Sequence, residues 1–235
     1  MAKSSKDRDR RARAEEIRKQ QAAQERRRTL LVLLACVLVG ALVIGFAGVK
    51  YLDTKRKENR DVDAIGLSAK AAGCQPVERK NAEGSGQHVN PGTTIKYSDA
   101  PPAFGKHWAN YLQGSEIKNY YTADDRPELE RLVHSLEHGY TIYWYDQTIA
   151  DDPDAVADLK SIADKYPIGD RLIIAPWTTD DGDEFADGTH VVLTHWTGPD
   201  NQQGIWQYCK KISGSVVEQF TKDFPAGNAP EAGAT

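Results

Sequence analysis

The stretch LVHSLEHGYTIYWY, residues 132–145, contains two histidines and a glutamate in the order H-x-x-E-H. These are His134, Glu137 and His138. Histidines four positions apart on a helix are neighbours and can bind one metal ion. The order is also the inverse of the H-E-x-x-H motif of zinc peptidases, in which the glutamate acts as general base. The spacing therefore allows a zinc site, with Glu137 as a candidate catalytic base, and a hydrogen-bonded histidine cluster without metal is the alternative.

A zinc site needs at least one more protein ligand, and four other histidines are candidates. They are His88, His107, His190 and His195. We favour His107, because it follows the turn of PPAFGKHW and precedes aromatic residues. The chain has one Met, which argues against a soft Cu(I) site. The predicted metal ligands are thus His107, His134 and His138.

The segment DDRPELERLVHSLEHG is expected to form the helix that presents these side chains. Asp124 or Asp125 suits the N-cap, and Gly139 suits the position just past the end. His134 and His138 lie nearly opposite the apolar stripe of this helix. They are therefore either exposed to solvent or placed on a second face that borders a site. The stripe consists of Leu129, Leu132, Val133 and Leu136.

The surrounding sequence predicts one small mixed domain of the α+β class. Short runs rich in β-branched and aromatic residues indicate strands, and runs with helical spacing indicate helices. Asp152 before Pro153 is a good helix start. Strands are expected at residues 93–99, 139–146, 171–177 and 189–196, and further helices at 152–167 and 213–224.

A run of 21 uncharged residues, Thr29 to Val49, predicts a transmembrane helix. At 1.5 Å per residue such a helix rises about 30 Å, the thickness of a bilayer core. A cleaved signal peptide has a shorter apolar region, and a lipoprotein cleaved before Cys36 would turn polar at once. The apolar residues that follow Cys36 favour the membrane span.

Charge predicts the orientation of this helix. Residues 1–28 contain 11 Lys or Arg and 5 Asp or Glu, so they carry a net charge of +6, and the total of −4 leaves −10 for residues 50–235. The positive-inside rule places the N-terminus in the cytoplasm and the following domain outside the cell membrane. The basic tail is expected to contact membrane lipids rather than nucleic acid, because no folded reader accompanies its charges.

The cysteines agree with an extracytoplasmic domain. Cys36 lies in the predicted span, which leaves Cys74 and Cys209 near the two ends of the exported part. Two cysteines in an oxidising compartment favour a disulfide, although unrelated thiols are the alternative.

The resulting order of segments has five parts. Residues 1–28 form a basic cytoplasmic tail and 29–49 the transmembrane helix. Residues 50–73 form a juxtamembrane linker, 74–225 the extracytoplasmic α+β domain, and 226–235 a flexible tail.

Two segments together carry a resemblance to a known family. HVNPGTTIKYSDAPPAFGKHW and RLVHSLEHGYTIYWY resemble the actinobacterial domain-of-unknown-function family 3105. The resemblance covers roughly residues 74–200. It implies a membrane-anchored extracytoplasmic protein without an established reaction, and it implies that His107, His134 and His138 belong to one constellation.

Three classes of function follow, and we favour the first. It is an accessory or scaffold subunit of an envelope membrane complex, supported by the single anchor and by aromatic residues suited to interfaces. Family context suggests other membrane-complex subunits as partners, with the respiratory cytochrome supercomplex as a candidate. The alternatives are a zinc-dependent hydrolase and a metal-binding protein. A peptidase is disfavoured, because peptidases with this motif are far larger. The aromatic residues are Trp108, Tyr111, Tyr120, Tyr121 and Trp144.

Overall fold

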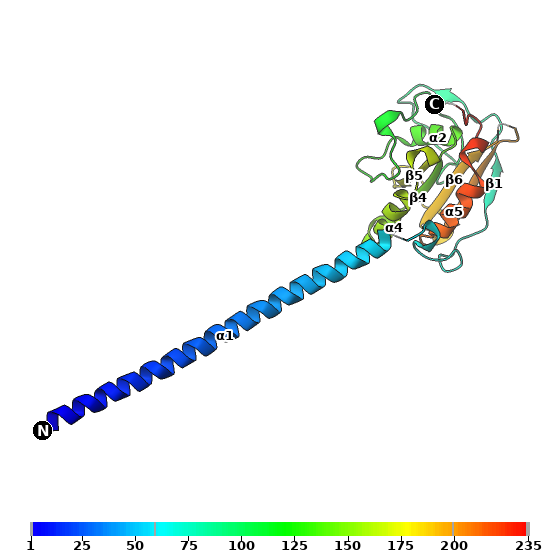
Figure 1. The fold of residues 1–235 in the computed structure, drawn as a ribbon. Coiled ribbons are helices and arrows are strands. Elements are labelled where there is room, and N and C mark those ends of the chain that lie inside the picture. The colour runs from blue at the N-terminus through cyan, green and yellow to red at the C-terminus, as the bar shows by residue number, and fades with distance from the viewer. Residues whose placement is uncertain (1, 59, 199, 234–235) are drawn as a thin grey trace. The chain divides into compact units, whose positions relative to one another are not determined.

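The computed structural model describes residues 2–58, 60–198 and 200–233. The chain divides into two compact units, Met1–Arg56 and Lys57–Thr235. Helix α1 (Ala2–Glu58) accounts for the first unit, and the second unit holds the sheet and the remaining helices (Figure 1).

Helix α1 is long and apolar enough to cross a membrane by its length and composition. The qualifying segment is Arg18–Asp53, which contains the predicted span Thr29 to Val49. Its apolar side chains have no partner within the described chain; Leu42 is 73% exposed and Ile44 74% exposed. An N-terminal helix of this kind could be a membrane anchor or a signal sequence.

The second unit is built around a five-stranded sheet and a separate two-stranded ladder. The larger sheet contains β1 (Glu78–Asn81), β4 (Thr141–Tyr145), β5 (Leu172–Pro176), β6 (Val191–Thr197) and β7 (Gln203–Cys209). The ladder contains β2 (His88–Val89) and β3 (His107–Trp108). The helices are α2 (Leu129–Glu137), α3 (Gln147–Ala150), α4 (Pro153–Ala163) and α5 (Gly214–Asp223), with short 3₁₀ turns between elements.

The strands of the larger sheet follow the order β1-β7-β6-β4-β5. Strands β4 and β5 are parallel and are joined through α3 and α4, whereas the other neighbours pair antiparallel. This mixture of a mainly antiparallel sheet with separate helices confirms the predicted α+β class.

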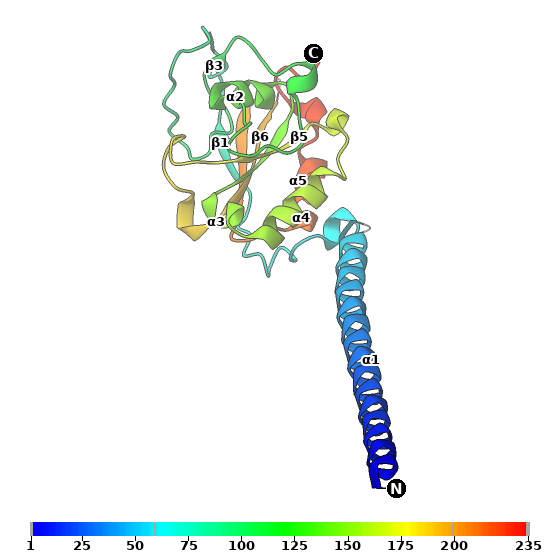
Figure 2. The ribbon, with the colours of Figure 1, turned by 90° about the vertical axis from the view of Figure 1, so that its left-hand side faces the viewer.

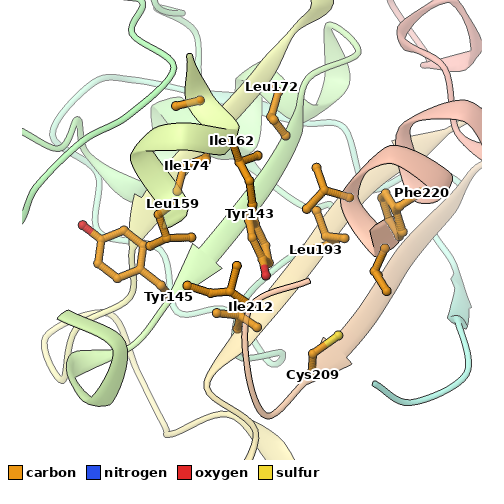
Figure 3. Close-up of a cluster of buried hydrophobic side chains, with 14 of the residues drawn as sticks. Tyr143, Tyr145, Leu159, Ile162, Leu172, Ile174, Leu193, Cys209, Ile212 and Phe220 are labelled. Atoms are coloured by element: carbon orange, nitrogen blue, oxygen red, sulfur yellow. The ribbon is translucent and has the colours of Figure 1, made fainter. Parts of the chain in front are cut away.

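Both faces of this sheet are covered, so the central strands are buried throughout. On one face, α4 and α5 cover side chains of the sheet that include Tyr143 and Leu193, and α5 contributes Phe220 to the same core (Figure 3). On the other face, α2 packs on side chains that include Ile142 and Trp144. Alternate side chains of β4 thus point into the two cores on opposite faces of the sheet. Figure 2 shows α2 and β3 at one end of the domain, away from α3 and α4.

Several predicted elements are confirmed, and α4 begins as the sequence indicates. The Asp152 carboxylate accepts hydrogen bonds from the backbone N–H groups of Asp154 and Ala155. The strands expected at 139–146, 171–177 and 189–196 correspond to β4, β5 and β6. Strands β1 and β7 were outside the predicted set.

Two local predictions were wrong. Residues 93–99 form no strand, because their polar groups bond elsewhere: the carbonyl of Thr93 accepts from Trp108 Nε1, and the N–H of Ile95 donates to Glu130. Helix α2 starts later than expected, after Glu128. Asp125 instead accepts from the N–H and hydroxyl of Thr122 and so closes the turn before the helix.

The structure also differs from the predicted domain boundaries. Ile65 and Ala72, in the expected linker, are fully buried in the second unit. In the expected flexible tail, Ala229 is 2% exposed and the N–H of Glu231 donates to the carbonyl of Glu137 at 3.0 Å. Residues 234–235 lie outside the described residues. The compact domain therefore extends beyond 74–225 at both ends.

A disulfide joins Cys74 to Cys209, 135 positions apart, as predicted. Cys209 ends the buried strand β7, so the bond ties the start of the domain to the sheet. Cys36 is a free, exposed thiol on α1.

We predict that Cys74→Ser/Cys209→Ser lowers the free energy of unfolding of the domain by about 4–5 kcal/mol, because closing so long a loop restricts the unfolded chain. Urea unfolding followed by tryptophan fluorescence measures the change. Cys36→Ser is the control and should leave the midpoint unchanged. A double variant as stable as the parent would contradict the prediction.

Candidate metal centre

Four potential metal ligands meet between α2 and the two-stranded ladder. His88 and His107 are direct register partners in the ladder, and His134 and Glu137 project from α2. One ligand atom from each of the four residues lies within 4.8 Å of the others. These four residues are called the histidine–glutamate cluster below. Three of them are buried, and the side chain of His88 is 43% exposed.

Backbone carbonyls orient two of these histidines. His107 Nδ1 lies 2.8 Å from the carbonyl oxygen of Gly105, and His134 Nδ1 lies 2.6 Å from that of Trp108. A carbonyl oxygen can only accept, so each Nδ1 carries a proton and donates. When such a ring is neutral, its Nε2 atom therefore carries the lone pair. Metal-binding histidines are typically oriented in this way.

Glu137 provides a buried carboxylate beside these nitrogens. The residue is 4% exposed, and its Oε2 lies 2.9 Å from His107 Nε2 and 3.6 Å from His88 Nε2. In the part of the chain that the structure describes, neither Glu137 Oε2 nor His107 Nε2 has a hydrogen-bond partner, so the short distance between these two atoms lacks hydrogen-bond geometry. Two buried acceptors in contact repel each other unless a proton or a cation lies between them.

Close packing fixes the position of the carboxylate. A Cβ at Gly86 would lie 2.4 Å from Glu137 Oε1 and 3.3 Å from Trp196, so only glycine fits there without displacing the carboxylate. The ring of His107 also packs edge-on to Trp196, with 6.0 Å between centroids. The cluster thus has a tightly packed wall on the side of β6.

His138 lies at the edge of the cluster and takes a different set of neighbours. Its Nε2 is 3.1 Å from His134 Nε2 and 3.7 Å from Glu231 Oε2. Because Nδ1 of His134 holds the proton of that ring, His138 Nε2 is the donor in the contact between the two rings. Glu137, His138 and Glu231 form a second group whose ligand atoms lie within 4.8 Å of one another.

The protonation states in this region suit metal binding. Burial lowers the pKa of His134 to about 4, and burial also lowers the pKa of His138. Burial alone would raise the pKa of Glu137, but the adjacent His107 ring, with His88 and His134 nearby, holds that pKa below its usual value. At neutral pH His134 and His138 are therefore neutral imidazoles and Glu137 is a carboxylate, which are the forms that bind metals.

A cavity of about 350 Å³ adjoins His138. Arg171 lines it and donates from Nη1 to the carbonyl oxygens of His138 and Ala232. This contact ties the end of α2 to the C-terminal segment. The lining residues are Tyr111, Leu112, Gln113, Gly114, Ile117, His138, Tyr140 and Arg171.

The structure brings two of the three predicted ligands, His107 and His134, into the cluster, whereas His138 groups with Glu137 and Glu231. Sequence reasoning preferred His107 to His88 as the third ligand, and it missed Glu137 and Glu231 as potential ligands. His88 begins the first of the two family-like segments, which was a signal for it. Glu231 has none, because it stands alone in a small polar tail.

The remaining histidines lie outside both groups of potential ligands. His190 Nδ1 is 2.7 Å from Asp146 Oδ2, and His195 is fully buried beside Thr141 and the carbonyl of Tyr140. Burial lowers the pKa of His195 to about 4.

We predict that the free energy of unfolding falls as the pH drops from about 6.5 to about 4. His195 is neutral in the folded state over this range, whereas the unfolded chain binds the proton, so acid favours unfolding. His195→Gln should flatten the slope by up to about 1.4 kcal/mol per pH unit. Urea unfolding at stepped pH, with a chelator present, measures both slopes. Equal slopes in parent and variant would refute this assignment.

The comparisons with known proteins agree with the resemblance seen in the sequence. No curated protein and no solved structure matched the chain. A family model matched residues 88–235, more than half of the chain, and this range contains every residue of the two groups of potential ligands. The chain belongs to the family described as Protein of unknown function (DUF3105).

Proposed function

We propose that this chain is a membrane-anchored protein whose domain binds a divalent metal of the zinc type through His88, His107, His134 and Glu137. One observation carries the proposal. His107 Nε2 and Glu137 Oε2 are buried 2.9 Å apart without a hydrogen bond, while Nδ1 of His107 is tied to a backbone carbonyl. A cation between these two atoms satisfies both of them.

The spacing of the ligand atoms supports a zinc-type ion. Tetrahedral zinc with bonds of about 2.0–2.1 Å to nitrogen or oxygen separates its ligand atoms by about 3.3 Å. The distances from Glu137 Oε2 to His107 Nε2 and His88 Nε2, 2.9 and 3.6 Å, lie on either side of this value. Imidazole and carboxylate are also ligands that zinc accepts.

The same geometry favours metal binding over peptidase chemistry. In the H-x-x-E-H peptidase arrangement, both histidines bind zinc and the glutamate stays free as a base. Here Glu137 lies among the potential ligands, and His138 is not part of the same four-residue group. Four protein ligands are typical of a closed zinc site, whereas a catalytic site keeps one position open for water.

We predict that the full chain, purified in detergent without an affinity tag, contains at least about one equivalent of zinc per chain. His107→Ala/His134→Ala should lose the metal bound by the cluster. Metal content by mass spectrometry, with circular dichroism to check folding, measures the loss. His190→Ala is the matched control, because this histidine lies outside both groups.

His88→Ala gives a second test that does not open the core. Its side chain is partly exposed, so the variant should fold and lower zinc affinity roughly tenfold or more. A folded parent chain that binds no zinc, cobalt or manganese would overturn the proposal. The group would then be a hydrogen-bonded histidine cluster.

We also infer that the domain is carried outside the cytoplasmic membrane as an accessory subunit of a membrane complex. The apolar side chains of α1 are exposed all around the helix in the described chain. This exposure supports an anchor that is covered by lipid or by other helices. The aromatic argument is weaker than the sequence suggested. Tyr121 and Trp144 are buried in the core, so three of the five residues remain for an interface.

We predict that the tagged full chain co-purifies in mild detergent with subunits of one membrane complex, the respiratory cytochrome supercomplex being the first candidate. A chain whose segment 29–49 is replaced by an unrelated membrane span separates the contribution of the helix from that of the domain. Recovery of the chain alone, with the complex intact in the same extract, would reject the accessory-subunit function.

A further inference from the structure

Glu137 belongs to both groups of potential ligands. It lies with His88, His107 and His134 on one side and with His138 and Glu231 on the other. We propose that the domain holds a second metal ion at Glu137, His138 and Glu231, with the Glu137 carboxylate shared between the two ions. This second site rests on the proposed function, because its first ligand is already part of the histidine–glutamate cluster.

The position of Glu231 is set by the backbone. Its N–H donates to the carbonyl of Glu137 at 3.0 Å, and the carbonyl of Ala232 accepts from Arg171 Nη1 at 2.9 Å. Earlier in the segment, the side-chain amide of Asn228 donates to the hydroxyl of Thr197 at 2.8 Å. These bonds hold the C-terminal segment across the end of α2 and leave the Glu231 carboxylate beside His138.

A shared Glu137 is chemically reasonable. An ionised carboxylate offers about four lone-pair sites on two oxygens, and Glu137 Oε2 uses none of them in a hydrogen bond. The residue is 4% exposed, so bulk water does not reach this oxygen. Two divalent ions near each other repel, and the negative charges of Glu137 and Glu231 offset that repulsion.

The contact between His134 and His138 couples the two sites. In the metal-free chain, His138 Nε2 donates its proton to His134 Nε2 at 3.1 Å. A metal bound by His134 Nε2 takes up that lone pair and ends the hydrogen bond. His138 then takes the neutral tautomer that carries its proton on Nδ1, which leaves the Nε2 lone pair for a second ion. The second ion therefore binds after the first.

The second site is also the more open one. The Glu231 side chain is 48% exposed and its Oε2 lies 3.7 Å from His138 Nε2. An exposed ligand on a terminal segment holds a metal less tightly than buried, pre-oriented histidines do. Binding should thus occur in two steps of different affinity.

The test is a zinc titration of the full chain in detergent micelles, in which equilibrium dialysis measures the bound zinc. The parent should bind two equivalents, the second more weakly than the first, and Glu231→Gln should bind one. Glu184→Gln removes a carboxylate from an exposed loop and is the matched control, expected to bind two. The Glu231→Gln change keeps the size of the side chain and the backbone hydrogen bond, so folding is preserved.

A second readout follows the C-terminal segment itself. Release of C-terminal residues by carboxypeptidase should slow when the second equivalent is added to the parent, and should not slow in Glu231→Gln. One equivalent in both parent and variant would overturn the second site and leave the first in place. No bound metal in the folded parent would overturn both. A second equivalent that Glu231→Gln still binds would also reject this site.

Discussion

The buried carboxylate of Glu137 is the group on which the arrangement of this end of the domain depends. A charge removed from water is costly unless other groups compensate for it. Here the imidazoles of His88 and His107 lie beside the carboxylate, the Gly86 turn packs closely against it, and the N–H of Glu231 in the C-terminal segment donates to the backbone carbonyl of Glu137. The Gly86 turn, the short ladder and the C-terminal segment lack a long regular element of their own, and their meeting at Glu137 gives them a common position.

Helix α2 connects this polar region to the rest of the domain. Its leucines pack on the same face of the sheet as Ile142 and Trp144. His134, Glu137 and His138 emerge from the other side of the helix and are nevertheless buried, because the ladder and the C-terminal segment cover them. The helix therefore separates an apolar core from a polar cluster, and the sheet beneath it keeps the ligands in place. A rigid support of this kind is what a metal site requires.

The two ends of the domain are fastened by different means. The disulfide between Cys74 and Cys209 joins the segment that enters the domain to the last strand of the sheet. At the C-terminal end, Arg171 bonds to the carbonyls of both His138 and Ala232. The first bond restrains the chain beside the apolar core, and the second restrains it beside the ligands. The position of Glu231 thus depends on the hydrogen bonds of Arg171, the residue just before β5.

The sequence alone was sufficient for features that arise from local pattern. The uncharged run of α1, the α+β class, the helix start at Asp152, the central strands and the cysteine pair all follow from composition and spacing. The spacing of His134 and His138 also indicated a second functional face on α2. Tertiary structure decided how the ligands are grouped. The pairing of His88 with His107, the approach of Glu231 and the assignment of Glu137 to both groups depend on contacts between distant segments. No local periodicity records such contacts, because they form only when the sheet, the ladder and the C-terminal segment pack together.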